Sequence, residues 1–204
     1  NKGWDLLKPI VTYNESLPDD NPYEGKLDKA NAPVFPYDLS KMFKEKGADV
    51  LRTTPFGNDI LAELAMKAIE KEELGKDDIT DFLTVSFSST DYVGHTFGPR
   101  SMELQDTYLR LDQTMSQFLN YLDKTVGKNN YLLFLTADHA GAENPNYLKD
   151  NKYSVKNIPS KDIVEALKKH SNETFGSDLI LDYSNFNLFF IKVIIRQQGL
   201  VLVI

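Results

Sequence analysis

The sequence of 204 residues contains no cysteine and only three histidines. The absence of cysteine excludes disulfide bonds and zinc sites built on thiolates. Basic residues are outnumbered by acidic ones. The sequence has 23 Lys and Arg against 30 Asp and Glu, which gives a net charge of −7. Nucleic acid and anionic membranes are therefore not expected as main partners, although a local metal centre can bind phosphate inside an acidic protein.

Long hydrophobic runs are missing as well. The apolar tail, residues 194–204, is interrupted by Arg196, Gln197 and Gln198, whereas a transmembrane helix needs about 20 consecutive apolar residues. The sequence has no internal repeat and no low-complexity segment. Its overall composition, 41% hydrophobic and 26% charged, is typical of a globular chain with one core.

Two short apolar runs each end in an acid and histidine cluster. Residues 82–90 lead into Asp91 and His95, and residues 131–137 lead into Asp138 and His139. Both runs are continuous and rich in β-branched and aromatic residues, which is typical of strands buried on both faces of a parallel sheet. Because ligands bind at the carboxyl ends of such strands, we expect the two clusters to share one crevice.

Carboxylates and imidazoles at such a crevice favour a divalent metal, and zinc in particular. Asp91 and His95 are four residues apart, so one helical turn or a wide loop would direct both at one ion. Asp138 and His139 are adjacent and would point to opposite faces of a continuing strand. They can share an ion only where the chain turns, which Gly141 and the alanines beside it permit.

The alternative is that these residues are structural. Asp91 would then cap the following turn, and Asp138 and His139 would make hydrogen bonds within a loop. The presence of two such clusters at equivalent strand ends favours the metal site. The remaining histidine, His170, follows two lysines near an expected helix end and is expected to be solvated rather than a ligand.

The residues around both clusters resemble a known family. Ser86 to Pro99 read S-F-S-S-T-D-Y-V-G-H-T-F-G-P, and Thr136 to Gly141 read T-A-D-H-A-G. Both motifs resemble those of the alkaline phosphatase superfamily, in particular the type I phosphodiesterase/nucleotide pyrophosphatase branch with its PafA-like bacterial alkaline phosphatases. Thr12 to Lys26 also resembles the PafA-like members, so the resemblance covers most of residues 1 to about 150.

The resemblance implies an α/β fold in which helices flank a mostly parallel sheet, present here in incomplete form. It also implies two zinc ions in the complete enzyme, with Asp91 and His95 as ligands of one and Asp138 and His139 as ligands of the other. No residue matches the family's Thr or Ser nucleophile, its third histidine ligand or its Lys/Arg phosphate clamp. The sequence is therefore interpreted as an internal or truncated fragment of a longer enzyme, inactive by itself.

The expected activity of that enzyme is metal-dependent hydrolysis of a small phosphate ester. Monoesters are expected to be preferred, with phosphodiester or nucleotide pyrophosphate hydrolysis as the other activity of the branch. Two alternatives stay open, namely a catalytically dead metal-binding or structural module and a member that acts like a sulfatase or phosphoethanolamine transferase. The resemblance further implies a periplasmic or secreted location, although no signal peptide is visible. Substrate-binding residues and the oligomeric state are not indicated.

The chain is expected to consist of a cap and a core. Residues 1–57 are rich in proline and aromatic residues and should form a loop or cap packed on the rest, with one short helix at 38–46 ended by Gly47. Residues 58–204 should form a partial α/β metallo-hydrolase core.

Hydrophobic periodicity predicts the helices of that core at 59–73, with Asn58 as its cap, at 101–126 and at 160–170. The helix at 101–126 would complete a right-handed βαβ crossover between the two apolar runs. Its polar residues Asp106, Arg110 and Asp112 lie off the apolar stripe and are expected to be solvated. An edge hairpin is expected within 179–195.

Overall fold

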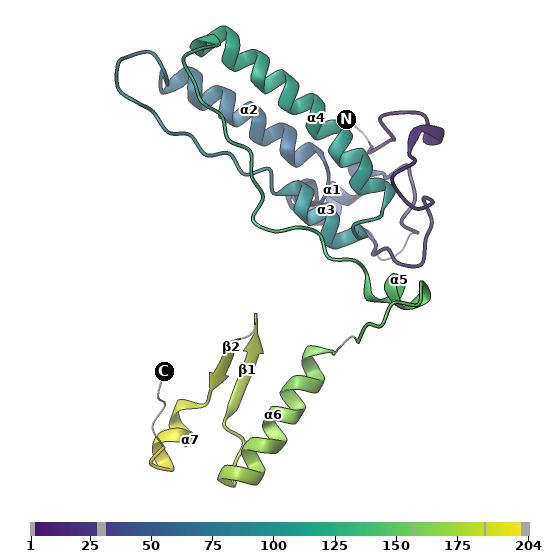
Figure 1. The fold of residues 1–204 in the computed structure, drawn as a ribbon, viewed down its shortest axis with the longest axis vertical. Helices are drawn as coiled ribbons and strands as arrows, with labels where there is room; N and C mark the ends of the chain where they lie inside the picture. Colours follow the sequence, from purple (N-terminus) through teal and green to yellow (C-terminus); the bar gives the residue numbers. More distant parts are fainter. Residues whose placement is uncertain (1–2, 28–31, 157, 186, 201–204) are drawn as a thin grey trace. The chain divides into compact units, whose positions relative to one another are not determined.

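The computed structural model describes residues 3–27, 32–156, 158–185 and 187–200 (Figure 1). The chain divides into two compact units, residues 1–152 and residues 153–204. All four residues expected as metal ligands belong to the first unit. The division into a cap at 1–57 and a core at 58–204 stays a prediction.

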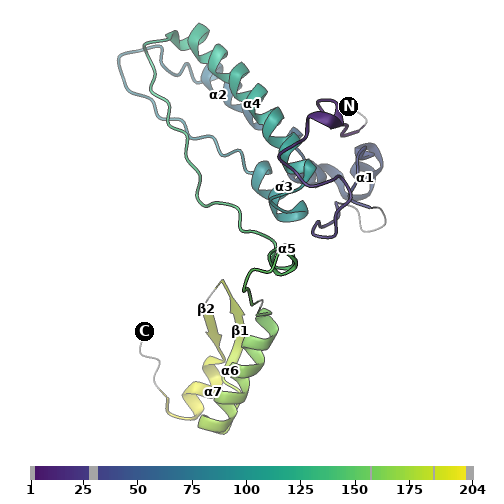
Figure 2. The same ribbon diagram turned by 45° about the vertical axis from the view of Figure 1, so that its right-hand side comes forward.

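Helices joined by long irregular segments make up the first unit (Figures 1 and 2). They are α1 Leu39–Lys46, α2 Phe56–Lys71, α3 Ser89–Phe97, α4 Met102–Leu122 and α5 Pro145–Asp150. Short 3₁₀ helices occur at Ile10–Thr12 and Gly47–Thr53, and a π-helical turn at Asp123–Gly127 extends α4. The helices expected at 38–46, 59–73 and 101–126 are thus confirmed, with ends that differ by a few residues.

Local sequence explains where α1 and α4 begin. The Asp38 carboxylate accepts hydrogen bonds from two backbone N–H groups of the first turn of α1, at 3.0 and 3.2 Å. The Ser101 hydroxyl accepts one from the backbone N–H of Leu104 at 3.1 Å. These side chains satisfy donors that a helix start leaves unpaired. Gly47 follows α1 with a φ of 68°, a conformation that residues with a Cβ disfavour.

Asn58 does not cap α2, contrary to the expectation from the sequence. The helix begins at Phe56, two residues before Asn58. Asn58 therefore lies inside the helix and is 1% exposed. Its Nδ2 donates to the Thr90 hydroxyl at 3.0 Å. A polar residue expected at a helix start therefore connects α2 to the first turn of α3.

The helices α2 and α4 pack side by side in both views (Figures 1 and 2). Ala65 and Ile69 of α2 meet Phe118 and Leu122 of α4 in one buried cluster. The Tyr121 hydroxyl of α4 donates to a backbone carbonyl of α2 at 2.9 Å. The helix α3 packs against both α2 and α4, so this helix pair fixes the position of α3.

A second core lies between the N-terminal segment and α3. Trp4 and Tyr37 form a backbone bridge with N···O distances of 2.9 and 3.0 Å. Their rings pack against Phe97 of α3 at centroid distances of 6.0 and 5.7 Å. The other buried members of this core are Leu27, Leu39, Met42, Val50 and Val93. The inner face of α3 is therefore fixed by the N-terminal segment.

Asp106 is the polar centre of this region and is fully buried. Its carboxylate accepts from Trp4 Nε1 at 2.8 Å, Leu7 N at 2.8 Å, Tyr13 Oη at 2.5 Å and Arg110 Nε at 2.7 Å. We call this group the Asp106 hub. The expectation that Asp106 and Arg110 are solvated is wrong, because their partners come from the first residues of the chain. Asp112 is exposed, as expected.

Glu103, on the preceding turn of α4, is a second fully buried acid. Tyr37 donates its hydroxyl to Oε1 of Glu103, and Oε2 has no hydrogen-bond partner among the described residues. Burial raises the pKa of Glu103 to about 7, against the lowering effect of the Tyr37 hydrogen bond. Burial and then the neighbouring Glu103 charge raise the pKa of Glu24 to about 9. The interior of the first unit thus contains acids that hold their protons to unusually high pH.

The two apolar runs are not paired strands. Residues 82–88 and 131–137 form no strand in the structure, and Figure 1 draws both as coil. Phe82, Leu132 and Phe134 are 90%, 80% and 82% exposed. The expected buried parallel strands and their βαβ crossover are thus not formed within the described residues, and 89–90 belong to α3 instead. A strand needs neighbours for its N–H and C=O groups, and neither run has one in the described part of the chain.

The second unit consists of α6 Ser160–Phe175, the antiparallel strands β1 Ile180–Ser184 and β2 Asn187–Phe190, and α7 Lys192–Gln197. The hairpin expected within 179–195 is confirmed, although its last part is the helix α7. The helix α6 continues beyond the expected end at His170 to Phe175, where Gly176 follows with a φ of 69°. None of the described helices combines the length and apolar character that a membrane crossing requires. Residues 201–204 of the apolar tail lie outside the described residues.

Candidate metal centre

Asp91 and His95 lie one turn apart on the outer face of α3. Val93 and Phe97 on the inner face are 0% and 1% exposed. Since these two residues anchor α3 in the core, the helical period turns Asp91 and His95 away from it. Gly98 ends the helix with a φ of 97°, so the chain leaves α3 directly after the turn that carries His95.

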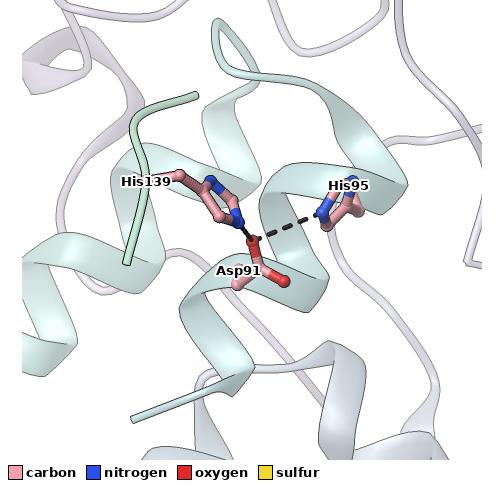
Figure 3. Close-up of side chains that lie close together, drawn as sticks. All are labelled: Asp91, His95 and His139. Atoms are coloured by element: carbon pink, nitrogen blue, oxygen red, sulfur yellow. Dashed lines mark ion pairs between the residues drawn. The ribbon is translucent and has the colours of Figure 1, made fainter. Parts of the chain in front are cut away.

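His139 reaches the same place from the loop that follows residues 131–137. Its Nε2 lies 3.5 Å from Asp91 Oδ1, and His95 Nε2 lies 3.4 Å from the same oxygen (Figure 3). The donor atoms of the three residues all lie within 4.8 Å of one another. Two segments that are separate in the sequence therefore bring one carboxylate and two imidazoles together.

This spacing suits an ion better than it suits hydrogen bonds. The N···O distances of 3.4 and 3.5 Å exceed the usual N–H···O range of about 2.7–3.2 Å. Zinc bonds of about 2.0–2.2 Å in a tetrahedral arrangement place neighbouring donor atoms roughly 3.3–3.6 Å apart. The two spacings between Asp91 and the histidines therefore match those around a divalent metal such as zinc, and all three donors lie within 4.8 Å of one another.

The three side chains are also open to solvent. Asp91, His95 and His139 are 44%, 71% and 54% exposed. Catalytic zinc usually combines three protein ligands with one open position for water or substrate. An ion held by these donors would therefore be accessible from outside the unit.

Asp138 lies beside this group and not in it. Its side chain is 87% exposed, and its Oδ2 is 3.7 Å from His139 Nε2. Its other oxygen accepts the backbone N–H of His139 at 3.1 Å, which bends the chain at that point. The structure thus brings together three of the four expected ligands. His170 is exposed in α6 and belongs to no group of metal-binding side chains in the described residues.

Sequence reasoning missed the residues that support this site. Arg100 forms an ion pair with Glu143, which joins the connection after α3 to the loop of His139. Asn58 contacts Thr90, the residue before Asp91. The only signal for these two residues is that Arg100 directly follows the first motif and Glu143 lies two residues after the second, because no local pattern predicts a pair of charges 43 positions apart.

Residues 6–183 of the chain match the family described as Type I phosphodiesterase / nucleotide pyrophosphatase. The chain is 44% identical over 204 residues to the alkaline phosphatase PafA of Elizabethkingia meningoseptica. This match covers 97% of the chain and 36% of that protein. It is 52% identical over 147 residues to the alkaline phosphatase PhoV of Synechococcus elongatus. This match covers 72% of the chain and 26% of that protein.

Solved structures agree with the sequence relatives. The crystal structure of wild-type alkaline phosphatase PafA matches with a TM-score of 0.89 at 41% identity, over 98% of this chain and 38% of that one. The alkaline-phosphatase-like fold expected from the sequence, in incomplete form, is thereby confirmed. The chain spans little more than a third of the length of PafA. On these matches, the chain belongs to the type I phosphodiesterase/nucleotide pyrophosphatase family.

Proposed function

We propose that this chain is part of a metal-dependent hydrolase of phosphate esters and that Asp91, His95, Asp138 and His139 hold its metal ions. The observation that carries this proposal is the meeting of three of these side chains at donor spacings of 3.4 and 3.5 Å. The relatives named alkaline phosphatases support the reaction class. Two zinc ions are proposed for the complete enzyme.

Divalent ions bound here would polarise a phosphoryl oxygen and activate a nucleophile. Asp91 supplies negative charge between two imidazoles, so its Oδ1 is available to an ion on either side. His139 Nδ1 lies 3.2 Å from the carbonyl oxygen of Ala140. With the proton on Nδ1, this contact directs the free Nε2 toward Asp91, as backbone carbonyls do for many metal-binding histidines. The nucleophile is assigned to no residue of this chain.

The test is phosphate-ester turnover by the longer protein with single ligand substitutions. Asp91→Ala and His139→Ala are expected to lower p-nitrophenyl phosphate hydrolysis by at least tenfold, because even residues that only support metal ligands contribute about 10 to 100-fold. His170→Ala is the matched control, since this exposed histidine lies outside the site. Each protein is stripped with chelator and then titrated with zinc. Wild-type rates in Asp91→Ala under these conditions would refute the assignment.

The chain of 204 residues by itself is proposed to lack measurable turnover. It offers no match to the family's nucleophile, although it retains a group that suits metal binding. A metal-binding module without catalysis is therefore the second candidate function for these residues alone. Phosphate release from the purified chain above that of its His139→Ala variant would exclude this candidate.

A preference for monoesters is proposed because the relatives PafA and PhoV are named alkaline phosphatases. A dianionic monoester places more charge on the phosphoryl oxygens than a diester does, and charge-assisted contacts distinguish the two. The measurement is kcat/KM of the longer protein for matched p-nitrophenyl mono- and diesters. A higher value for the diester would overturn this preference.

A periplasmic or secreted location is proposed from the family resemblance. Fractionation of cells that produce the longer protein tests it, with a cytoplasmic marker enzyme as reference. Recovery with the cytoplasmic marker would contradict the proposal.

A further inference from the structure

The loop that carries His139 has little structure of its own. Residues 137–144 form neither helix nor strand, and the preceding run 131–137 is unpaired. His139 itself contacts Asp91, its neighbour Asp138 and the next carbonyl. Contacts elsewhere must therefore fix the loop beside α3.

Arg100 makes a two-bond contact with this loop. Its Nε donates to Oε2 of Glu143 at 3.0 Å, and its Nη2 lies 2.8 Å from Oε1 of the same carboxylate. Two parallel bonds of this kind fix orientation as well as distance. Glu143 is four residues after His139, and Arg100 is five residues after His95. A single ion pair thus joins the two segments that supply the imidazoles.

Aromatic contacts extend this junction. The Arg100 guanidinium lies over the Tyr147 ring of α5, 4.6 Å from its centroid, in a cation–π arrangement. Tyr147 in turn packs edge-to-face on Tyr23 at 5.3 Å. The Asn144 side chain donates to the backbone carbonyl of Tyr23 at 2.9 Å. The segment after His139 is thereby held on one side by the connection that follows α3 and on the other by the N-terminal segment.

The junction is not a ligand pocket. The cavity at this junction is lined by Arg100, Glu143, Tyr147 and their neighbours. It has a volume of about 10 Å³. That is room for about one water molecule, whereas ligand pockets measure several hundred Å³. These residues therefore act on the site through the position of the loop.

We propose that Arg100, Glu143 and Tyr147, which we call the Arg100 anchor, are positioning residues that hold His139 against Asp91 and His95. The inference rests on the proposed metal centre. Without the anchor, the loop samples positions in which His139 no longer lies beside Asp91 and His95, so the ligands from the two segments do not form one metal centre. Metal binding then includes the cost of ordering the loop, so affinity falls.

The test uses the chain of 204 residues with Arg100→Ala, Glu143→Ala and the charge exchange of Arg100→Glu with Glu143→Arg. Amide hydrogen exchange of residues 138–144, measured without metal, reports how well the loop is ordered. Cobalt titration followed by visible absorption measures the affinity for the ion. Each single substitution is expected to speed exchange and to weaken cobalt binding about tenfold, the lower range for supporting residues. The double alanine variant should be no worse than either single one, and the charge exchange should restore part of both readouts.

Lys67→Ala is the matched control, because it breaks an exposed ion pair of 2.6 Å within α2. It should leave both readouts as in the wild type. Unchanged exchange and unchanged cobalt affinity in Arg100→Ala would overturn the inference, as would single-variant effects that add in the double variant. If wild-type cobalt binding is insensitive to His139→Ala, the metal centre itself is refuted, while hydrogen exchange still decides whether the anchor holds the loop.

Discussion

Two aspartates in the first unit show how a structural carboxylate differs from the carboxylate of the candidate metal centre. Asp106 is fully buried, and four protein donors approach it within 2.8 Å. Asp91 is 44% exposed and faces two imidazoles at 3.4 and 3.5 Å. The oxygens of Asp106 already accept hydrogen bonds from the protein, whereas Asp91 has two imidazole nitrogens beside it at distances that suit a metal ion better than hydrogen bonds. The identity of the residue does not distinguish them, but the nature of their neighbours does.

The largest effect that this comparison predicts is on stability, for Asp106→Ala. The substitution leaves Arg110 and the other buried donors of the hub without their acceptor, so the free energy of unfolding should fall by about 3–5 kcal/mol. Urea unfolding followed by Trp4 fluorescence measures it. Asp112→Ala, an exposed aspartate on the same helix, should change stability by less than about 0.5 kcal/mol. Equal effects of the two substitutions would show that the hub is not structural.

Glu103 sharpens the comparison, because it is buried like Asp106 but has an oxygen without a partner. Its folded pKa of about 7 lies above its ordinary value of 4.5, so the folded state binds more protons between these values. Its stabilising contribution is therefore complete below pH 4.5 and is lost as the pH rises to about 7. Glu24, with a pKa of about 9, continues the loss to higher pH.

The measurement is the free energy of unfolding of wild type and Glu103→Gln from pH 4.5 to 8. Glutamine keeps an oxygen for the Tyr37 hydroxyl but does not titrate. The wild type should lose stability across this range, and the variant should lose less. Parallel curves would contradict the assignment of Glu103, and rising stability of the wild type would contradict the sign.

A smaller effect is expected from Tyr13→Phe. Burial and the hydrogen bond to Asp106 raise the pKa of Tyr13 to about 12, so its hydroxyl is a donor throughout the usual pH range. Removing one of four donors should cost about 1 kcal/mol. Tyr108→Phe, at a residue of α4 that is 57% exposed, serves as the control and should be neutral. A loss as large as that of Asp106→Ala would mean that the hub depends on this one bond.

The smallest effect on stability is expected at the candidate metal centre. In chelator, Asp91→Asn should change the free energy of unfolding by no more than about 0.5 kcal/mol, since an exposed side chain with no close hydrogen bond contributes little. Added zinc should stabilise the wild type and not the variant. A loss above about 1 kcal/mol in chelator would place Asp91 with Asp106, among the structural carboxylates.

Helices and motifs were predictable from the sequence because their signals are local. The Gly47 that follows α1 and the period of α4 both act within one or two turns. The motif residues Asp91, His95 and His139 were expected in one place, and the structure brings them together. Asp138 was expected with them and lies alongside.

Long-range partners were not predictable. The contact between Trp4 and Asp106 spans 102 positions, and no pattern around Asp106 distinguishes it from the exposed Asp112. The runs 82–88 and 131–137 have the composition of buried strands, but strand pairing depends on neighbours that the described residues do not supply. The ion pair of Arg100 and Glu143 was missed for the same reason.

The unpaired runs have a consequence for the metal centre. Residues 82–88 continue directly into α3, three positions before Asp91, and residues 131–137 continue directly into Asp138. Polypeptide that paired with these runs would therefore also fix the positions of the candidate ligands that follow them. By thermodynamic reciprocity, if ordering the runs raises metal affinity by some factor, the bound metal favours their ordering by the same factor. Metal affinity then measures how completely the surrounding structure has formed, and metal concentration becomes one of the variables that control its formation.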